Sequence, residues 1–485
     1  MNLKTLLYLP LFLLLLCAPA DAVESESLSV EMLQEDFRAL YAGLQSAHYD
    51  LFANRTKDQY DALFEQTLST LDQPMSRHDA NVLFQKFTAF GNVAHARIDY
   101  DRSRYETYRE DGGTILPVYL RIADGRMYVE DNRSDDRSLI PGTEILEING
   151  ESVQVWLART GEYVSADTDY IAESLLEYWF NMYLWEALGP VEQFDLTVFG
   201  ADQEQRAVSI AALNTEAMQA NTSDQSEYFS LDGTAREAQM LDDTVAYLRP
   251  GPFYNFEQPE QAWDNSSFVR FIDEAFATFI EAEAQQLVID LRNNPGGDNS
   301  FSDVMVAWFA DQPFKFASAF YIRSSKEAKT SNQARLDANP GQTEGVSVFF
   351  GRRYEEVPFG ERFEFPIPEV ATRTGERFTG AVYVLIDRHS YSNAVNVAAL
   401  IQDYGFGEIM GEKTADFATS YGAMETFSLP NTGFVVGFPK AHIIRPSGDL
   451  KNDGVTPDVA IPSPIVPTKT DVVLEAALRH IAAAD

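Results

Sequence analysis

The segment 386–397, IDRHSYSNAVNV, carries two serines where a predicted strand passes into a predicted helix. The apolar run AVYVL before it has the length of a buried strand, and the residues after it place apolar side chains at helical spacing up to Gly405. A strand-to-helix turn directs the free N–H groups of the first helical turn at any bound group, which favours an anion or a developing oxyanion. Ser390 and Ser392 are therefore candidates for a catalytic nucleophile, and the alternative is that one of them only caps the helix.

A second segment with chemical potential is LVIDLRNNPGGDNS, residues 287–300. Its apolar half predicts a strand that ends in a loop containing Gly296 and Gly297. Ligands of α/β folds bind at the carboxyl ends of the strands, and glycines let the backbone approach a substrate closely. The same letters also fit an ordinary loop, so the segment indicates a site only in combination with others.

Three kinds of element must position these two segments. Residues 23 to about 105 space their apolar side chains at three and four, which predicts helices. From about residue 112 the period changes to two, and the tetrapeptide Ala-Asp-Gly-Arg at 123–126 predicts a hairpin turn. A helical stretch rich in aromatic residues, 156–188, interrupts this pattern, and a polar linker follows at 222–237. Strands then alternate with helices to about residue 465, which predicts an α/β core with parallel strands.

The composition limits the classes of function. The net charge of −37, with no visible basic patch, excludes a nucleic-acid-binding protein. The first 22 residues predict a signal peptide cleaved after Ala22, and the single cysteine, Cys17, lies inside it. We therefore expect a soluble exported protein, periplasmic or extracellular, without membrane insertion after cleavage. No G-x-S-x-G, S-x-x-K or H-E-x-x-H motif and no metal-ligand spacing occurs, so we expect no metal and no cofactor.

Together with GVTPDV near the C-terminus, the two segments resemble peptidase family S41, the tail-specific or C-terminal processing proteases. The resemblance covers roughly residues 30 to 462. It implies a signal peptide at 1–22, an N-terminal helical cap at 23–105, a PDZ-like β-rich domain with a helical insertion at 106–220, and a crotonase/ClpP-like α/β protease core at 221–485. PDZ modules capture an extended peptide at a sheet edge, and the helical insertion leaves a purely structural role open here.

The resemblance implies roles for individual residues. Alignment of the serine segment without a gap places the nucleophile on Ser392, and the N–H groups of Asn393 and Gly296 would hold the oxyanion, with Gly297 as the alternative to Gly296. Many members use a lysine 25 residues after the serine as base, but Phe417 stands there in this chain, and Lys413 falls four residues early.

A second branch of the family, which includes tricorn-like and chlamydial-factor-like proteases, takes a histidine from the cap as its base. His95, in FGNVAHARIDY, stands in that place, so we expect it to be the general base. The acid that orients this histidine is expected 58 to 60 residues after the serine, where the sequence departs from the pattern and has Lys451. The remaining carboxylate candidates, in order of preference, are Asp453, Asp449 and Glu412, and a missing acid is the last alternative.

Two hypotheses of different class follow. The first is an exported serine endopeptidase that hydrolyses peptide bonds of unfolded or C-terminally presented protein substrates through Ser392, His95 and Asp453. The second is a non-catalytic protein on the same fold that binds a peptide or an apolar ligand. Hydrolysis that depends on both Ser392 and His95 distinguishes the first from the second.

Overall fold

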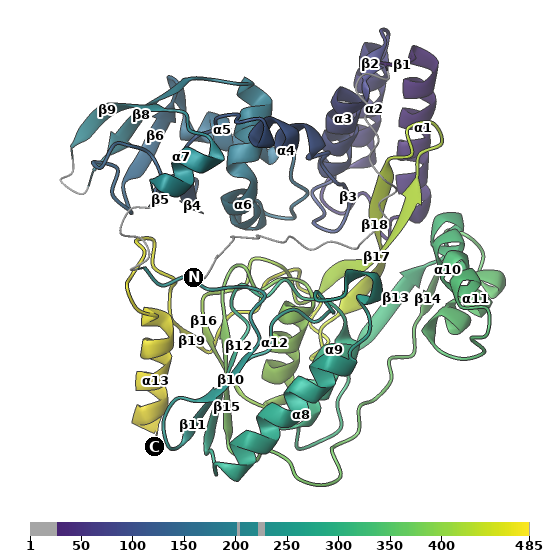
Figure 1. Cartoon of the computed structure of the whole chain (residues 1–485). Helices are drawn as coiled ribbons and strands as arrows, with labels where there is room; N and C mark the ends of the chain where they lie inside the picture. Colours follow the sequence, from purple (N-terminus) through teal and green to yellow (C-terminus); the bar gives the residue numbers. More distant parts are fainter. Residues whose placement is uncertain (1–26, 201–203, 222–227, 485) are drawn as a thin grey trace.

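The computed structural model describes residues 27–200, 204–221 and 228–484, so the predicted signal peptide and Cys17 lie outside the described residues. Figure 1 shows three parts. A helical cap with α1 to α3 and a β-rich insert with β4 to β9 lie side by side above an α/β core that contains α8, α9, α12 and α13.

The cap is built from three amphipathic helices that bury one shared cluster of aromatic and aliphatic side chains. On α1 the apolar side chains recur at helical spacing, and Phe37 packs against Phe84 and Phe87 of α3 with ring centroids 5.3 and 4.7 Å apart. Side-chain caps fix where these helices begin, as at Thr56 before α2. The elements of the cap are β1 Ser27–Leu28, α1 Val30–Ala47, α2 Lys57–Thr70, β2 Met75–Ser76, α3 Arg77–Ala89 and β3 Arg97–Ile98.

The insert is an antiparallel sheet in the order β4-β5-β6-β8-β9, with the short β7 paired to β6. The predicted hairpin is confirmed, since Ala123 pairs with Arg126 across its turn. The aromatic stretch forms two helices, α5 and α6, which share a buried cluster with the sheet. The elements are α4 Ser103–Glu110, β4 Val118–Ala123, β5 Arg126–Asn132, β6 Glu144–Ile148, β7 Glu151–Ser152, α5 Val153–Gly161, α6 Asp169–Leu188, β8 Gln193–Phe199, β9 Gln205–Ala211 and α7 Thr215–Ala220.

The core sheet has the order β10-β11-β12-β15-β16-β19, and its strands from β11 onward pair in parallel, as the alternation of strands and helices predicts. The inner strands β11, β12, β15 and β16 are almost wholly buried because helices cover both faces: α8, α9 and α12 on one, α13 on the other. The elements are β10 Glu237–Met240, β11 Val245–Arg249, α8 Ser266–Glu281, β12 Gln286–Asp290, α9 Asn299–Ala307, β15 Ala381–Ile386, α12 Asn393–Tyr404, β16 Glu408–Gly411, β19 Val459–Ala460 and α13 Val472–Ala484.

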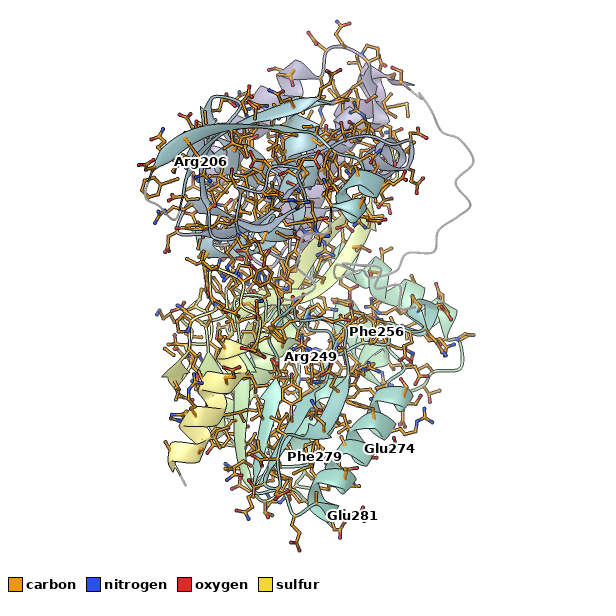
Figure 2. The ribbon with its side chains drawn as sticks, turned by 60° about the vertical axis from the view of Figure 1, so that its left-hand side comes forward. Arg206, Arg249, Phe256, Glu274, Phe279 and Glu281 are labelled. Atoms are coloured by element: carbon orange, nitrogen blue, oxygen red, sulfur yellow. The ribbon has the colours of Figure 1, made fainter. Side chains whose placement is uncertain are left out.

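Helix α8 illustrates how the pattern of the sequence produces this packing. Figure 2 shows Phe279 on the side of the helix that faces the sheet, whereas Glu274 and Glu281 point outward. Phe279 is fully buried, and both glutamates are exposed. The apolar stripe of the helix therefore lies against the sheet, as its spacing of three and four predicts.

A second sheet, in the order β14-β13-β18-β17, connects the core with the cap. Its longest strand, β18, pairs with β13 through its last residues and with β3 of the cap through Val436 and Gly437. The elements of this part are β13 Ala319–Arg323, α10 Lys326–Ala338, α11 Val346–Glu356, β14 Arg362–Glu364, β17 Ser420–Ser428 and β18 Val435–Ile444. Because β3 directly follows the loop that contains His95, this sheet connects that loop to the core.

In the parts of the chain that the structure describes, no helix has both the length and the apolarity needed to span a membrane. Of the predicted linker, residues 228–236 contain no helix or strand, and 222–227 lie outside the described residues.

Candidate active site

The turn between β15 and α12 holds Ser392 in a backbone conformation that side chains rarely adopt, with φ 50° and ψ −118°. A positive φ at a residue other than glycine is strained and is found mainly where function requires it. The Ser392 side chain makes no capping hydrogen bond to the helix, so the capping alternative is wrong for this serine. Ser390 is fully buried, and its hydroxyl donates to the carbonyl oxygen of Leu291 at 2.8 Å. Of the two serines, only Ser392 has the setting of a nucleophile.

The glycine loop after β12 touches this turn. Gly296 has φ 84°, and a Cβ atom on it would lie 2.5 Å from the carbonyl oxygen of Tyr391 and 2.7 Å from the nitrogen of Asn393. Only a residue without a side chain permits so close an approach. The two segments that the sequence analysis selected are therefore in contact in the folded chain.

One of the two N–H groups expected to stabilise an oxyanion, that of Gly296, differs from the expectation. The N–H of Gly296 donates to the side-chain oxygen of Asn294 at 2.9 Å, so it is already engaged within its own loop. The N–H groups of Gly297 and Asn393 have no acceptor among the described residues. Gly297, the alternative named from the sequence, is therefore the glycine whose N–H is available for an oxyanion.

His95 lies next to the turn that carries Ser392, residues 387–392. Its ring stacks on that of Tyr391, the residue before Ser392, with centroids 5.6 Å apart. Burial lowers the pKa of His95 to about 4, the charge of Asp167 acts in the opposite direction, and a backbone hydrogen bond with Tyr421 also favours the charged ring. The imidazole is therefore neutral at pH 7, the state in which it can accept a proton.

Two carboxylates that the sequence analysis did not name belong to the site: the half-buried Asp167 acts on His95, and the buried Asp416 binds the backbone of Ser392. Asp167, in the loop before α6, accepts the N–H of Ala94 at 2.9 Å, and burial raises its pKa. Asp416 accepts the N–H of Ser392 at 2.7 Å, and burial raises its pKa to about 6, although two backbone N–H groups oppose that shift. One signal was visible in the sequence: Asp416 directly precedes Phe417, the position of the lysine that many S41 peptidases use.

The comparisons with known proteins agree with this geometry. The model of peptidase family S41 matches residues 254–461. We refer to residues 254–461 as the S41 region. This region contains Ser392, Asn393 and both glycines of the loop, whereas His95 lies ahead of it in the cap.

Solved structures match nearly the whole chain. The structure of mature CPAF complexed with lactacystin is 16% identical in sequence and has a TM-score of 0.63, over 94% of this chain and 97% of that one. Mature CPAF alone gives 16% identity and a TM-score of 0.60, over 93% and 96%. No curated protein matches the chain in sequence. The chain thus has a mixed α/β fold resembling that of CPAF, with cap and insert in addition to the S41 region.

The candidates for the orienting acid have other partners. Asp453 forms ion pairs with Lys413 and Lys451, and although burial raises its pKa, the hydrogen bonds of these two lysines lower it below the usual range. Lys413 is thereby occupied as well. Glu412 binds Arg388 at 3.1 Å and the hydroxyl of Tyr170 at 3.0 Å. The side chains of Asp453, Lys413 and Glu412 connect segments around the S41 region. Among the described residues, none of the three forms a hydrogen bond with His95.

A buried ionic cluster joins the insert to the turn that carries Ser392. Glu177 of α6 binds Arg121 of β4 at 3.0 Å, Arg388 at 3.3 Å and His389 at 2.7 Å. The guanidinium of Arg388 also donates to the carbonyl oxygen of Ile122. The turn from Asp387 to Ser392 is therefore held from the insert as well as from the core.

Within the described residues no group of three or more His, Cys, Asp or Glu side chains has the arrangement of a metal site.

Proposed function

We propose that the chain is an exported serine endopeptidase of the S41 type that hydrolyses unfolded or C-terminally presented protein substrates. The observation that carries the proposal is the turn at Ser392: a serine with positive φ, without a capping bond, in contact with Gly296, and with His95 stacked on the residue before it. The match of residues 254–461 to the family model supports it.

In the proposed mechanism the Ser392 hydroxyl oxygen attacks the carbonyl carbon of the scissile peptide bond while His95 takes the hydroxyl proton. The negative charge that develops on the carbonyl oxygen is stabilised by the N–H groups of Asn393 and Gly297. His95 then gives its proton to the leaving amine, and the peptide C–N bond breaks. Water, activated by the same histidine, hydrolyses the acyl ester and restores Ser392.

The positively charged form of His95 that appears in this cycle needs a compensating charge. We propose Asp167 for that role because its charge acts on the His95 ring and its carboxylate binds the N–H of the preceding residue, Ala94. The backbone of Tyr421 would orient the ring. Asp453, the acid inferred from the sequence, remains a prediction, and its two lysine partners argue for a structural role instead.

The decisive experiment uses the chain from residue 23 to 485 with an unfolded, reduced and alkylated protein as substrate. We expect fragments from the native chain, a loss of about 10³-fold or more in Ser392→Ala, and a loss of about 10²- to 10⁴-fold in His95→Ala. A fluorophosphonate probe, which reacts with activated serines, should label the native chain and not Ser392→Ala.

Ser390→Ala is the matched control for this experiment because Ser390 lies two residues from Ser392 and its hydroxyl is engaged with Leu291. Circular dichroism establishes that each variant is folded. Absence of both hydrolysis and labelling in the folded native chain contradicts the proposal and favours a non-catalytic ligand-binding protein. N-terminal sequencing of the protein recovered outside the cytoplasm tests export, with Val23 as the expected first residue.

A further inference from the structure

A cavity of about 280 Å³ opens beside the candidate active site. Three of its lining residues are Ala94, Pro295 and Tyr391, each directly before a site residue: His95, Gly296 and Ser392, respectively. The cavity is therefore lined by the immediate chain neighbours of His95, Gly296 and Ser392. A side chain of a polypeptide bound at Ser392 would reach it.

One face of α6 forms another part of the wall. Leu175, Tyr178, Trp179 and Met182 stand at positions i, i+3, i+4 and i+7, so they share a face of the helix, and this face lines the cavity. This aromatic stretch interrupts the alternating strand pattern of the insert. The stretch therefore covers the insert sheet and also forms part of the cavity wall.

The floor of the cavity consists of rings that hold one another in place. Tyr183 stacks on Tyr163 with centroids 4.7 Å apart and contacts Tyr100 edge to face at 5.7 Å. All three side chains are buried and line the cavity. Because their packing does not depend on a ligand, the cavity is formed in advance, which lowers the entropic cost of binding.

The three arginines of the lining are already engaged within the protein. Arg97 lies 2.9 Å from Asp99, and Arg388 is bound by Glu177 and Glu412. The Arg102 guanidinium lies over the Trp179 ring at 5.4 Å. An acidic ligand would therefore find no unpaired cation among these three, and the aromatic and aliphatic wall is what remains for recognition.

We propose that this cavity is a specificity pocket that receives one large apolar or aromatic side chain of the polypeptide bound at Ser392. Its volume lies just below the range of about 300–1,000 Å³ typical of sites for drug-sized ligands, which suits one large side chain rather than a free cofactor. Pairs of aromatic rings attract one another beyond the gain from burial alone, so Phe, Tyr and Trp are favoured over aliphatic side chains of similar size. The inference deepens the proposed function and rests on it for the position of the scissile bond.

The binding test is independent of turnover. The Ser392→Ala chain is titrated with two series of peptides of identical sequence except for one central residue, Phe or Ala, and tryptophan emission is recorded because Trp179 lines the cavity. We expect the Phe peptide to change the emission saturably, with an affinity at least tenfold higher than that of the Ala peptide, and the change to disappear in Ser392→Ala/Trp179→Phe. Equal affinity of both peptides overturns the pocket.

A cleavage test uses a pair of matched variants. Leu175→Trp fills the cavity from α6, whereas Leu157→Trp changes a half-buried leucine of α5 that does not line it. Relative to Leu157→Trp, we expect Leu175→Trp to lower kcat/KM for the Phe peptide about tenfold or more and to leave the Ala peptide within about twofold. Equal effects on both peptides overturn the inference.

The two proposals fail in different ways. Ser392-dependent hydrolysis whose cleavage sites, mapped by mass spectrometry, show no preference for large apolar residues overturns the pocket and leaves the peptidase intact. Preferential binding of the Phe peptide to a folded chain that never hydrolyses it overturns the peptidase and supports the pocket as a ligand site.

Discussion

The backbone N–H of Ser392 donates a 2.7 Å hydrogen bond to the carboxylate of Asp416, a residue that is itself almost completely buried. The other carboxylate oxygen accepts the N–H of Phe417. This pair of bonds ties the strained serine to the segment after β16. Asp416 therefore fixes the backbone of Ser392, the proposed nucleophile.

The buried charge of Asp416 should make stability depend on pH. Because burial raises its folded-state pKa from 3.8 to about 6, the folded protein holds a proton that the unfolded chain releases, so stability falls as pH rises from about 4 to 6. Two pKa units correspond to about 3 kcal/mol in the free energy of unfolding. Urea unfolding of the native chain and of Asp416→Asn should differ in slope over this pH range, with the native chain losing more stability. Parallel curves would contradict this assignment.

Gly296→Ala should abolish the close contact between the glycine loop and the nucleophile turn. Its methyl group would lie 2.5 Å from the Tyr391 carbonyl oxygen, so the turn must move, and we expect a loss of about 10²-fold or more in kcat, comparable with losing one oxyanion donor. Gly341→Ala is the control because nothing lies within 4 Å of its Cβ. Steady-state kinetics on one peptide compares the two, and equal kcat values would show that the contact is dispensable.

The pH dependence of the rate should reflect the buried state of His95. A base acts when it is deprotonated, and burial lowers the pKa of this one to about 4, so kcat/KM should remain near its plateau down to about pH 5 and fall below that. An exposed histidine would produce the same fall near pH 6.5. The profile of kcat/KM from pH 3.5 to 8 for a peptide without ionisable side chains distinguishes the two, provided that the chain stays folded over that range.

Asp167→Asn should impair the positively charged form of His95. We expect a loss of about tenfold or more in kcat/KM, equivalent to about 1.4 kcal/mol, together with a shift of the acidic limb to lower pH, because the Asp167 charge raises the His95 pKa. Asp453→Asn is the comparison, and its carboxylate is held by two lysines, so we expect less than a twofold change. A larger loss in Asp453→Asn, with the pH limb displaced, would assign the orienting role to the acid inferred from the sequence.

Glu177→Gln should destabilise the protein through the cluster that joins insert and nucleophile turn. Its carboxylate is bound by two arginines and a histidine and is only 7% exposed. Its loss leaves Arg121 and Arg388 with the single carboxylate of Glu412, so one buried positive charge is uncompensated, at a cost of about 3–5 kcal/mol. Glu356→Gln, which breaks the exposed pair with Arg353, should change the free energy of unfolding by less than about 1 kcal/mol. Urea titrations of both variants test this, and similar values would show that the cluster contributes no more than a surface pair.

The parts of the site that local sequence specifies were predictable. The strand before Ser392, the helix after it and the glycine loop each have a strong local pattern, and their order in an α/β fold brings them to one edge of the sheet. The N–H of Gly296 is engaged by an Asx turn from Asn294, and the sequence Asn-Pro-Gly is compatible with such a turn.

The two carboxylates of the site, Asp167 and Asp416, were not predictable in the same way. Asp167 lies in a loop of the insert, and Asp416 lies in a turn of the core, so neither belongs to a periodic pattern. The approach of Asp167 to His95 and of Asp416 to Ser392 arises from long-range packing, which one sequence does not encode locally. Asp453 was inferred from the family resemblance and its distance from Ser392 along the chain, and neither reveals the lysines that compete for a carboxylate.

Strand β18 has a consequence for the order of events during biosynthesis. His95 is placed by β3, and β3 acquires its partner only when Val436 and Gly437 are present. A nascent chain that extends to the end of α12 already contains the serine, the glycines and the histidine, but it lacks this partner strand. Such a chain lacks the strand that holds the His95 loop, so we expect the proposed base and nucleophile to come together only after residues 436 and 437 have left the ribosome.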